Sequence, residues 1–164
     1  MALEDIFSRV KQARRRLGLM ADADRNKILS EVADAIERNT DKLLVSNCKD
    51  LARMAEDNPM YDRLRLTDAR LKDIADAMRQ VGQCPSPLGH VQKHRVLENG
   101  MDFKRVSVPF GVIGVVFEAR PNVCFDVFAL CLKSGNACIL KCGKDAIDSC
   151  LAAVDLIHDV LRKA

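Results

Sequence analysis

The chain has 164 residues, which suits one globular domain with a sizeable hydrophobic core. Its apolar fraction of 48% and charged fraction of 30% are typical of a folded protein and exclude a disordered tail. The net charge of +3, the lack of Trp and the single Tyr argue against nucleic-acid binding, because they provide neither a strong positive field nor aromatic side chains for base stacking.

The lack of targeting signals and the spacing of the cysteines further limit the classes of protein that the chain can represent. No apolar run approaches the roughly 18 to 20 residues that span a bilayer, and the N-terminal stretch MALEDIFSRVKQARRR does not resemble a secretory signal. We therefore expect a cytoplasmic protein that does not contact membranes. The seven cysteines include no C-x-x-C pair, so we expect neither a disulfide framework nor a metal site. Most of them are expected to pack as small apolar side chains.

The first eighty residues predict a set of amphipathic helices. In the first helix, an apolar stripe of helical spacing accompanies five basic residues between Arg9 and Arg16, and we interpret the basic residues as a solvated face opposite a buried stripe. Thr40 and Thr67 are predicted N-caps of the third and fourth helices. The stripe of the first helix comprises Leu3, Ile6, Phe7, Val10 and Leu17.

From residue 84 the pattern changes from helix to strand. Pro and Gly residues interrupt the helical pattern over residues 84–89. Asn99-Gly100 then separates two strand-like segments, Arg95–Glu98 and Met101–Val108, which predicts a β-hairpin with a two-residue turn.

Residues beyond the hairpin predict the order strand, helix, strand, helix. The apolar run Gly111–Phe117 has four β-branched residues, which is typical of a parallel strand buried on both faces. After an apolar helix that ends near Leu132, a second strand is expected at Ala137–Leu140, and a final helix from about Asp145. This βαβα unit predicts the start of a doubly wound α/β sheet. Because two core-type strands cannot be covered by the rest of the chain, we interpret the sequence as truncated.

Motifs of nucleotide binding and of catalysis are incomplete. No G-x-G-x-x-G follows the first strand and no P-loop occurs, so a nucleotide would dock at the helix starts, in the loops Glu118–Asn122 and Lys141–Asp145. The three histidines, His90, His94 and His158, are expected at surface or boundary positions. The sequence therefore predicts no complete active site.

The stretch VPFGVIGVVFEARPNVCFDVFALCLKSGNACILKCGKDA, from Val108 to Ala146, closely resembles the γ-glutamyl phosphate reductases of the aldehyde dehydrogenase superfamily. The helical part resembles the same family through LLVSNCKDL and YDRLRLTDARLKDIADAMRQV. The resemblance implies an aldehyde dehydrogenase-like α/β fold with three parts. These are N-terminal helices in residues 1–83, a linker and an oligomerisation-type β-hairpin in residues 84–108, and the first βαβα unit of a Rossmann-like NADP-binding sheet in residues 109–164.

The resemblance also implies a reaction. Members of the family reduce γ-glutamyl phosphate with NADPH to glutamate 5-semialdehyde in proline biosynthesis, by attack of a cysteine thiolate on the acyl phosphate. The nucleophilic cysteine is expected beyond Ala164, so this chain is expected to be inactive alone. The full-length protein is expected to be a homo-oligomer, and glutamate kinase is suggested as a partner.

By the same resemblance, two loops are expected to contact the cofactor. Lys141 matches the superfamily lysine that reaches the adenosine ribose, and Lys144 replaces the glutamate with which NAD-preferring relatives bind the ribose hydroxyls. A cation there would attract the 2′-phosphate of NADP. Alternatively, both are solvated lysines at a helix start. The expected cofactor contacts are Glu118, Ala119, Arg120, Lys141, Gly143 and Lys144.

Arg120 occupies the place of the asparagine that stabilises the oxyanion in many relatives, so we hypothesise that it contacts the acyl phosphate or its developing charge. The alternative is a salt bridge with Glu118 or Asp126. For the whole chain, two other functions stay open: a non-catalytic nucleotide-binding or dimerisation module, and a reductase of the same superfamily that acts on another acyl phosphate.

Overall fold

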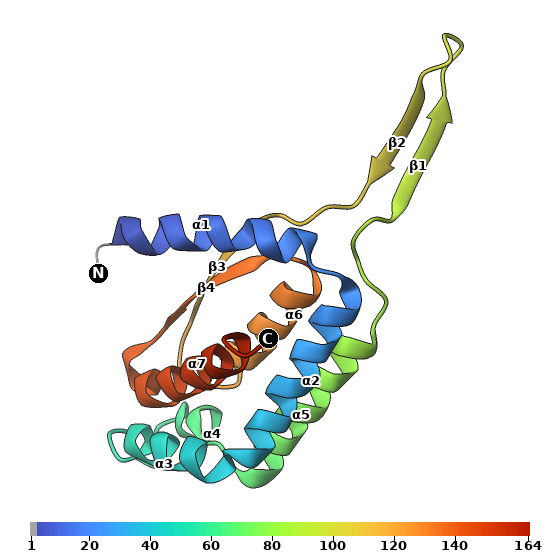
Figure 1. The fold of residues 1–164 in the computed structure, drawn as a ribbon. Helices are drawn as coiled ribbons and strands as arrows, with labels where there is room; N and C mark the ends of the chain where they lie inside the picture. The colour runs from blue at the N-terminus through green and yellow to red at the C-terminus, as the bar shows by residue number, and fades with distance from the viewer. Residues whose placement is uncertain (1–2) are drawn as a thin grey trace.

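The structure is a computed structural model that describes residues 3–164 (Figure 1). Its N-terminal part consists of helices α1 (Leu3–Leu19), α2 (Asp22–Arg38), α3 (Thr40–Leu51), α4 (Tyr61–Leu64) and α5 (Asp68–Gln83). The hairpin strands β1 (Val91–Val96) and β2 (Asp102–Val106) follow. The remainder comprises β3 (Val112–Phe117), α6 (Val123–Lys133), β4 (Ala137–Cys142), the 3₁₀ turn η1 (Lys144–Ala146) and α7 (Ile147–Leu161).

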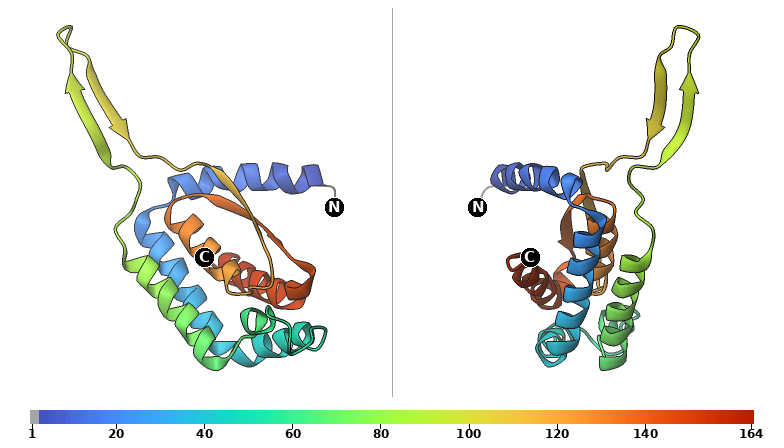
Figure 2. Two further views of the ribbon diagram at one scale, coloured as in Figure 1. Left: turned by 180° about the vertical axis from the view of Figure 1, so that it is seen from behind. Right: turned by 45° about the vertical axis from the view of Figure 1, so that its right-hand side comes forward.

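The elements form a helical body around a small parallel sheet, with the hairpin projecting away from it (Figures 1 and 2). Strands β1 and β2 pair antiparallel, whereas β3 and β4 pair parallel from Val112 beside Ala137 to Phe117 beside Cys142. Helix α6 connects β3 to β4, so the predicted βαβα order is confirmed. No helix among residues 3–164 is long and apolar enough to cross a membrane.

One buried apolar cluster joins the N-terminal helices to the βαβα unit. Helix α2 packs on α5, α5 packs on α6, and α3 packs on α7. Because these pairs link distant parts of the chain, the helical segment and the sheet unit share a core. Fully buried members of this cluster include Leu29, Val32, Ile36, Leu71, Met78 and Phe125.

The two predicted N-caps have different outcomes. Thr67 caps α5, since its side-chain oxygen accepts a hydrogen bond of 3.2 Å from the backbone N–H of Arg70. The prediction for Thr40 was wrong: this residue is the first of α3, and its hydroxyl lies 3.3 Å from the carbonyl oxygen of Ile36 and 3.2 Å from that of Glu37. Only Asn39 separates α2 from α3, so the hydroxyl bonds to the last turn of the preceding helix.

The hairpin is present, but its strand bounds and its turn differ from the prediction. The loop covers residues 97–101, closed by bonds of 2.9 Å from the N–H of Leu97 to Met101 and from the N–H of Gly100 to Leu97. A two-residue type I′ turn needs positive φ at both central residues. Here Gly100 has φ +83° whereas Asn99 does not, because no residue other than glycine has positive φ among residues 3–164. Instead, the side chain of Asn99 accepts a bond from the N–H of Met101.

Strand β3 is not buried on both faces, so that prediction was wrong. Its exposed positions alternate, and Val116 is 81% exposed. Within the described part of the chain nothing packs over this face. Strand β4 runs two residues further than predicted, to Cys142, so Lys141 lies inside the strand and does not end it.

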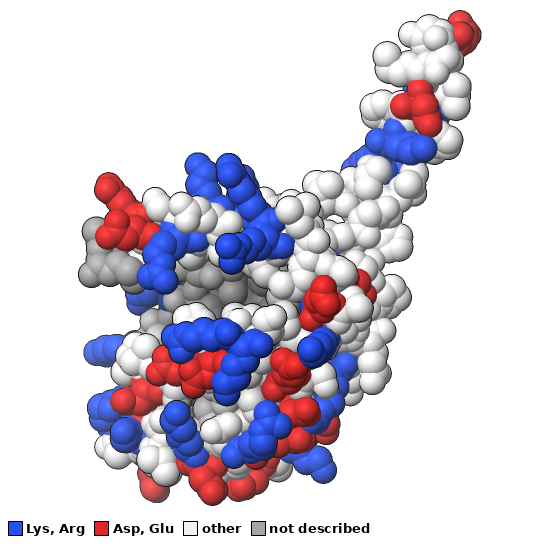
Figure 3. Space-filling model, viewed as in Figure 1, with Lys and Arg blue, Asp and Glu red and all other residues white. Residues whose placement is uncertain are grey.

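The apolar stripe of α1 is also less buried than predicted. No residue of α1 is buried, and Leu3 and Phe7 are more than half exposed. The other stripe residues lie over β4 and, with α6 and α7, line a groove of about 410 Å³. The basic residues of α1 are exposed, as predicted, and Figure 3 shows Lys and Arg gathered on this helix.

All seven cysteines are free thiols. Cys124, Cys131 and Cys150 are buried, and Cys138 and Cys142 are half-buried, as expected for packing residues. Cys48 and Cys84 are exposed, because they lie on the outer side of α3 and immediately after α5.

Candidate functional site

The two loops that the sequence singled out lie side by side at one edge of the parallel sheet. Phe117 at the end of β3 pairs with Cys142 at the end of β4, so Glu118 and Gly143 leave neighbouring strands together. A Cβ added to Gly143 would lie 3.5 Å from the Cα of Glu118 and 3.9 Å from the amide nitrogen of Ala119. The carboxyl ends of parallel strands, followed by helix starts, are the usual nucleotide site of α/β sheets.

Both expected cofactor lysines have exposed side chains. Lys141 lies in β4, and its ammonium donates to the carbonyl oxygen of Cys142 at 3.0 Å. Lys144 begins η1 directly after Gly143, and no carboxylate among residues 3–164 pairs with it. This arrangement fits a phosphate-bearing cofactor, because the ammonium of Lys144 is available to an anion beside the strand edge.

The loop after β3 contains one buried and two exposed site residues. Ala119 is 1% exposed and anchors the loop, whereas the side chains of Glu118 and Arg120 face solvent. The alternative salt bridge of Arg120 with Glu118 or Asp126 does not form within the described residues. Arg120 is therefore free to meet an anionic ligand.

Asp126 lies half-buried in the first turn of α6 and accepts a hydrogen bond of 3.0 Å from the side-chain amide of Asn122. Burial raises the pKa of this carboxyl, and the bond from Asn122 only partly opposes that effect. The Asn122–Asp126 bond ties the end of the 118–122 loop to α6.

A buried network that the sequence analysis missed positions the second loop. The carboxylate of Asp50 in α3 accepts bonds from the N–H groups of Asp148, at 3.1 Å, and Ser149, at 2.8 Å, and one from the Ser149 hydroxyl. Asn47 donates to the Ser149 hydroxyl at 3.0 Å and to the carbonyl oxygen of Leu64 at 2.8 Å. Asp50 thus caps α7 from another helix, and this bond holds η1 and Lys144 in place.

Asn136 was also missed, although the turn containing it was predicted. It is 3% exposed, and its side-chain oxygen accepts a bond of 2.7 Å from the N–H of Gly111. Gly111 has φ +116°, and the guanidinium of Arg14 lies 2.9 Å from the position of a Cβ there. Asn136 therefore sets the register in which β3 enters the sheet beside β4. This bond joins a side-chain amide to the backbone of a residue 25 positions away, so no sequence motif predicts it.

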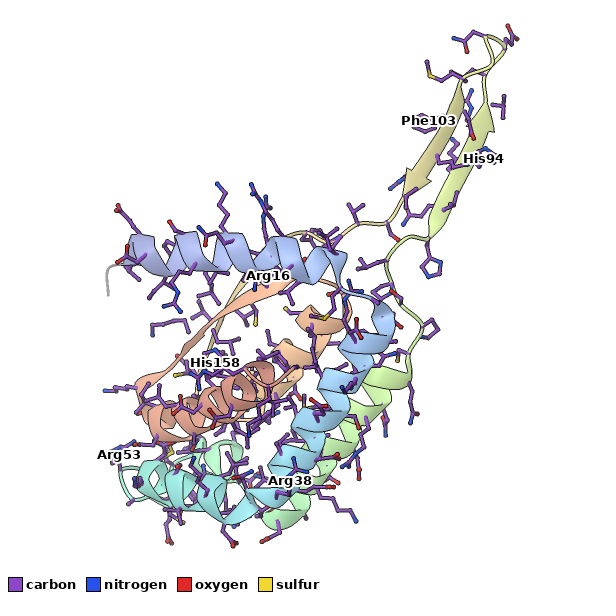
Figure 4. All side chains as sticks on the ribbon, viewed as in Figure 1. Arg16, Arg38, Arg53, His94, Phe103 and His158 are labelled. Carbon is purple, nitrogen blue, oxygen red and sulfur yellow. The ribbon has the colours of Figure 1, made fainter. Side chains whose placement is uncertain are left out.

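The histidines lie at exposed positions, as predicted. His90 and His94 are exposed in and beside the hairpin, and His158 is exposed on α7; Figure 4 labels the last two. Among residues 3–164, no group of three or more His, Cys, Asp or Glu side chains could hold a metal ion.

No family model matches the chain. Its sequence is 55% identical over 163 residues to the γ-glutamyl phosphate reductase of Bacteroides fragilis, a match that covers 99% of this chain and the N-terminal 39% of that protein. The chain is similar to the N-terminal part of γ-glutamyl phosphate reductases over nearly its whole length. It spans about two fifths of the length of the curated relatives that it matches.

Solved structures show the same similarity. The crystal structure of the γ-glutamyl phosphate reductase of Thermotoga maritima superposes with a TM-score of 0.91 at 31% identity, over 96% of this chain and 39% of that one. PnpE in complex with nicotinamide adenine dinucleotide has a TM-score of 0.71 at 19% identity, over 94% of this chain and 30% of that one. The predicted aldehyde dehydrogenase-like α/β fold is confirmed.

Proposed function

We propose that this chain supplies the first part of the cofactor site of an NADPH-dependent γ-glutamyl phosphate reductase, which forms glutamate 5-semialdehyde in proline biosynthesis. The observation that carries the proposal is the contact between the 118–122 and 141–145 loops at the carboxyl ends of β3 and β4. The high identity to reductases of the same family over nearly the whole chain supports the choice of substrate.

A nicotinamide cofactor would supply the hydride, and this chain would hold its adenosine half. Lys141 and Lys144 provide exposed ammonium groups at the strand edge, and the complex of PnpE with nicotinamide adenine dinucleotide shows that a related fold binds such a cofactor. Lys144 favours NADP, because an ammonium attracts the 2′-phosphate that NAD lacks. Arg120 would face the acyl phosphate from the neighbouring loop.

The nucleophile is proposed to lie outside this chain, beyond Ala164. Cys142 lies within the 141–145 loop, but burial raises the pKa of its thiol, so it stays protonated at neutral pH. A protonated thiol is a poor nucleophile, which supports a cysteine elsewhere in the full-length reductase.

The β1–β2 hairpin is proposed to form an intersubunit contact. It projects from the body and carries exposed apolar side chains, among them Phe103, which Figure 4 labels. Exposed strands with apolar side chains are ready to pair with another chain, which supports a homo-oligomer of the full-length protein.

The function can be tested with a chimaera that joins residues 1–164 to the C-terminal remainder of the Bacteroides fragilis relative. We expect the chimaera to oxidise glutamate 5-semialdehyde with NADP⁺ and phosphate, the reverse reaction, at a rate comparable with that of the relative. The chain alone should show no turnover. A folded chimaera without activity would contradict the proposed reaction, and turnover by the chain alone would contradict the placement of the nucleophile.

Replacing Lys144 by glutamate in this chimaera should shift the preference from NADPH towards NADH by about 1–2 kcal/mol, the scale of a charge-assisted hydrogen bond. The ratio of kcat/KM for the two cofactors measures this shift. The control is Lys49→Glu, which changes the net charge equally at an exposed position of α3. If the ratio of kcat/KM for NADPH and NADH is the same in both variants, Lys144 does not contact the cofactor.

A further inference from the structure

A second hollow opens beside the 118–122 loop. It measures about 380 Å³, within the range of small-molecule pockets, about 300–1,000 Å³. One wall comes from α4, the start of α5 and the segment between them, and the other from Arg120 and Asn122. The hollow therefore adjoins the place where the acyl phosphate is proposed to react.

The walls of this hollow are positively charged. Four arginines and two aspartates line it, which leaves a formal charge of +2. These side chains are Arg63, Arg65, Arg70, Arg120, Asp62 and Asp73. A net positive pocket favours a ligand that carries more negative than positive groups.

Three of these six charged side chains already pair with one another. Both carboxylate oxygens of Asp62 lie 3.0 Å from the guanidinium of Arg70, and one lies 3.2 Å from that of Arg65. The hydrogen bond from Arg70, helped by its charge, lowers the pKa of Asp62, so this carboxyl stays ionised at neutral pH. Asp62, Arg65 and Arg70 thus form a preorganised frame around the hollow.

The other three charged side chains have no partner of opposite charge among the described residues. The guanidinium of Arg63 makes one side-chain hydrogen bond within residues 3–164, to the sulfur of Met60 at 3.6 Å. Asp73 and Arg120 make no side-chain hydrogen bond within residues 3–164. Two free guanidinium groups and one free carboxylate therefore remain, which suit a ligand with two anionic groups and one cationic group.

We propose that this hollow binds the amino-acid end of an acidic α-amino acid substrate, with Arg63 on the α-carboxylate and Asp73 on the α-ammonium. The acyl phosphate, or a side-chain carboxylate in its place, then faces Arg120. This assignment rests on the proposed function and deepens it, because it names the residues that would select an α-amino acid over a simple acyl phosphate. Arg63 and Asp73 are binding residues and take no part in the chemistry.

An NMR titration of the 164-residue chain with L-glutamate tests the proposal. Glutarate, which lacks the ammonium, and 4-aminobutyrate, which lacks the α-carboxylate, are the matched comparison ligands. We expect saturable shifts confined to α4, the start of α5 and residues 118–122, with L-glutamate binding more tightly than either comparison ligand. Equal affinity for all three ligands, or shifts spread over the surface, would overturn the assignment.

Variants separate the two contacts. Arg63→Ala should weaken L-glutamate and glutarate about three- to fivefold, the scale of an exposed ion pair, and leave 4-aminobutyrate unchanged. Asp73→Asn should weaken L-glutamate and 4-aminobutyrate to a similar degree and leave glutarate unchanged. The controls are Arg15→Ala and Asp57→Asn, at exposed positions outside the hollow. If the Arg63 and Asp73 variants bind all three ligands like the parent chain, the assignment is wrong.

The chimaera separates this proposal from the proposed function. There, Arg63→Ala should raise KM for glutamate 5-semialdehyde and leave KM for NADP⁺ unchanged. An active chimaera in which Arg63→Ala has no effect on either KM would contradict the amino-acid site in the hollow but support the proposed reductase function. If the chimaera is inactive but the three ligands bind the parent chain and its variants as expected, the reductase function is contradicted and the amino-acid site is supported.

Discussion

Replacing Asp50 by alanine should lower the free energy of unfolding by about 3 kcal/mol, as expected for loss of a buried, hydrogen-bonded charge. The Asp50 side chain is fully buried, and its carboxylate accepts hydrogen bonds from two backbone N–H groups at the start of α7 and from the Ser149 hydroxyl. Arg53 also donates to this carboxylate and to Asp148, at the edge of the same network. Alanine would leave the N–H groups and the hydroxyl without an acceptor. Urea denaturation at pH 7 measures the loss.

The matched control is Asp57→Ala, which removes an exposed carboxylate between α3 and α4 and should change stability little. A loss below about 1 kcal/mol for Asp50→Ala would show that the network adds little to stability. Because α7 follows η1, the Asp50 variant should also weaken the NADPH binding that we propose for Lys144. The control variant should not.

Replacing Lys133 by methionine should cost about 3 kcal/mol of stability, near the lower end for a broken buried ion pair. The side chain is only 5% exposed, and its ammonium donates to Asp22 at 3.0 Å, to Asn26 at 2.7 Å and to the carbonyl oxygen of Gly82 at 3.2 Å. It thereby joins the end of α6 to α2 and α5. Methionine keeps the length of the side chain but removes the ammonium donor from all three acceptors; Asp22 keeps the bond of 3.2 Å from Asn26. The control is Lys27→Met, at a 74% exposed side chain.

The cost of Lys133→Met should depend on pH. Burial alone would raise the pKa of Asp22, but hydrogen bonds from Lys133 and Asn26 outweigh it and lower that pKa. A lowered folded-state pKa stabilises the fold above the unfolded-state pKa of about 4, and this stability is lost as the pH falls through the folded-state value. The difference between parent and variant should therefore narrow below about pH 4. An equally large difference at pH 7 and pH 3 would exclude Asp22 as the group responsible.

Features that depend on neighbouring residues could be predicted from the sequence. The order of β3, α6, β4 and α7 follows from apolar runs and turn residues, and Thr67 caps its helix within four residues. The meeting of the 118–122 and 141–145 loops was also predictable, because the carboxyl ends of adjacent parallel strands share one edge. The family resemblance added which residues in those loops would meet a cofactor.

Burial along α1 and β3 was decided by tertiary structure. Their apolar patterns are those of elements packed on a core, yet Phe7 and Val116 are exposed because no described element covers them. Periodicity states which side of an element is apolar, but not what lies against it.

The residues that support the site were likewise beyond sequence reasoning. Asp50 bonds to Ser149 across 99 positions, and Arg63 lines the same hollow as Arg120 although they belong to separate segments of the chain. In the sequence, Asp50 and Arg63 resemble ordinary charged residues of helices. The sequence alone was enough to predict the order of the elements and which edge of the sheet carries the two loops. Only the packing of α3, α4 and α5 on the βαβα unit decided which distant charges meet there, because such pairing depends on contacts that no local pattern encodes.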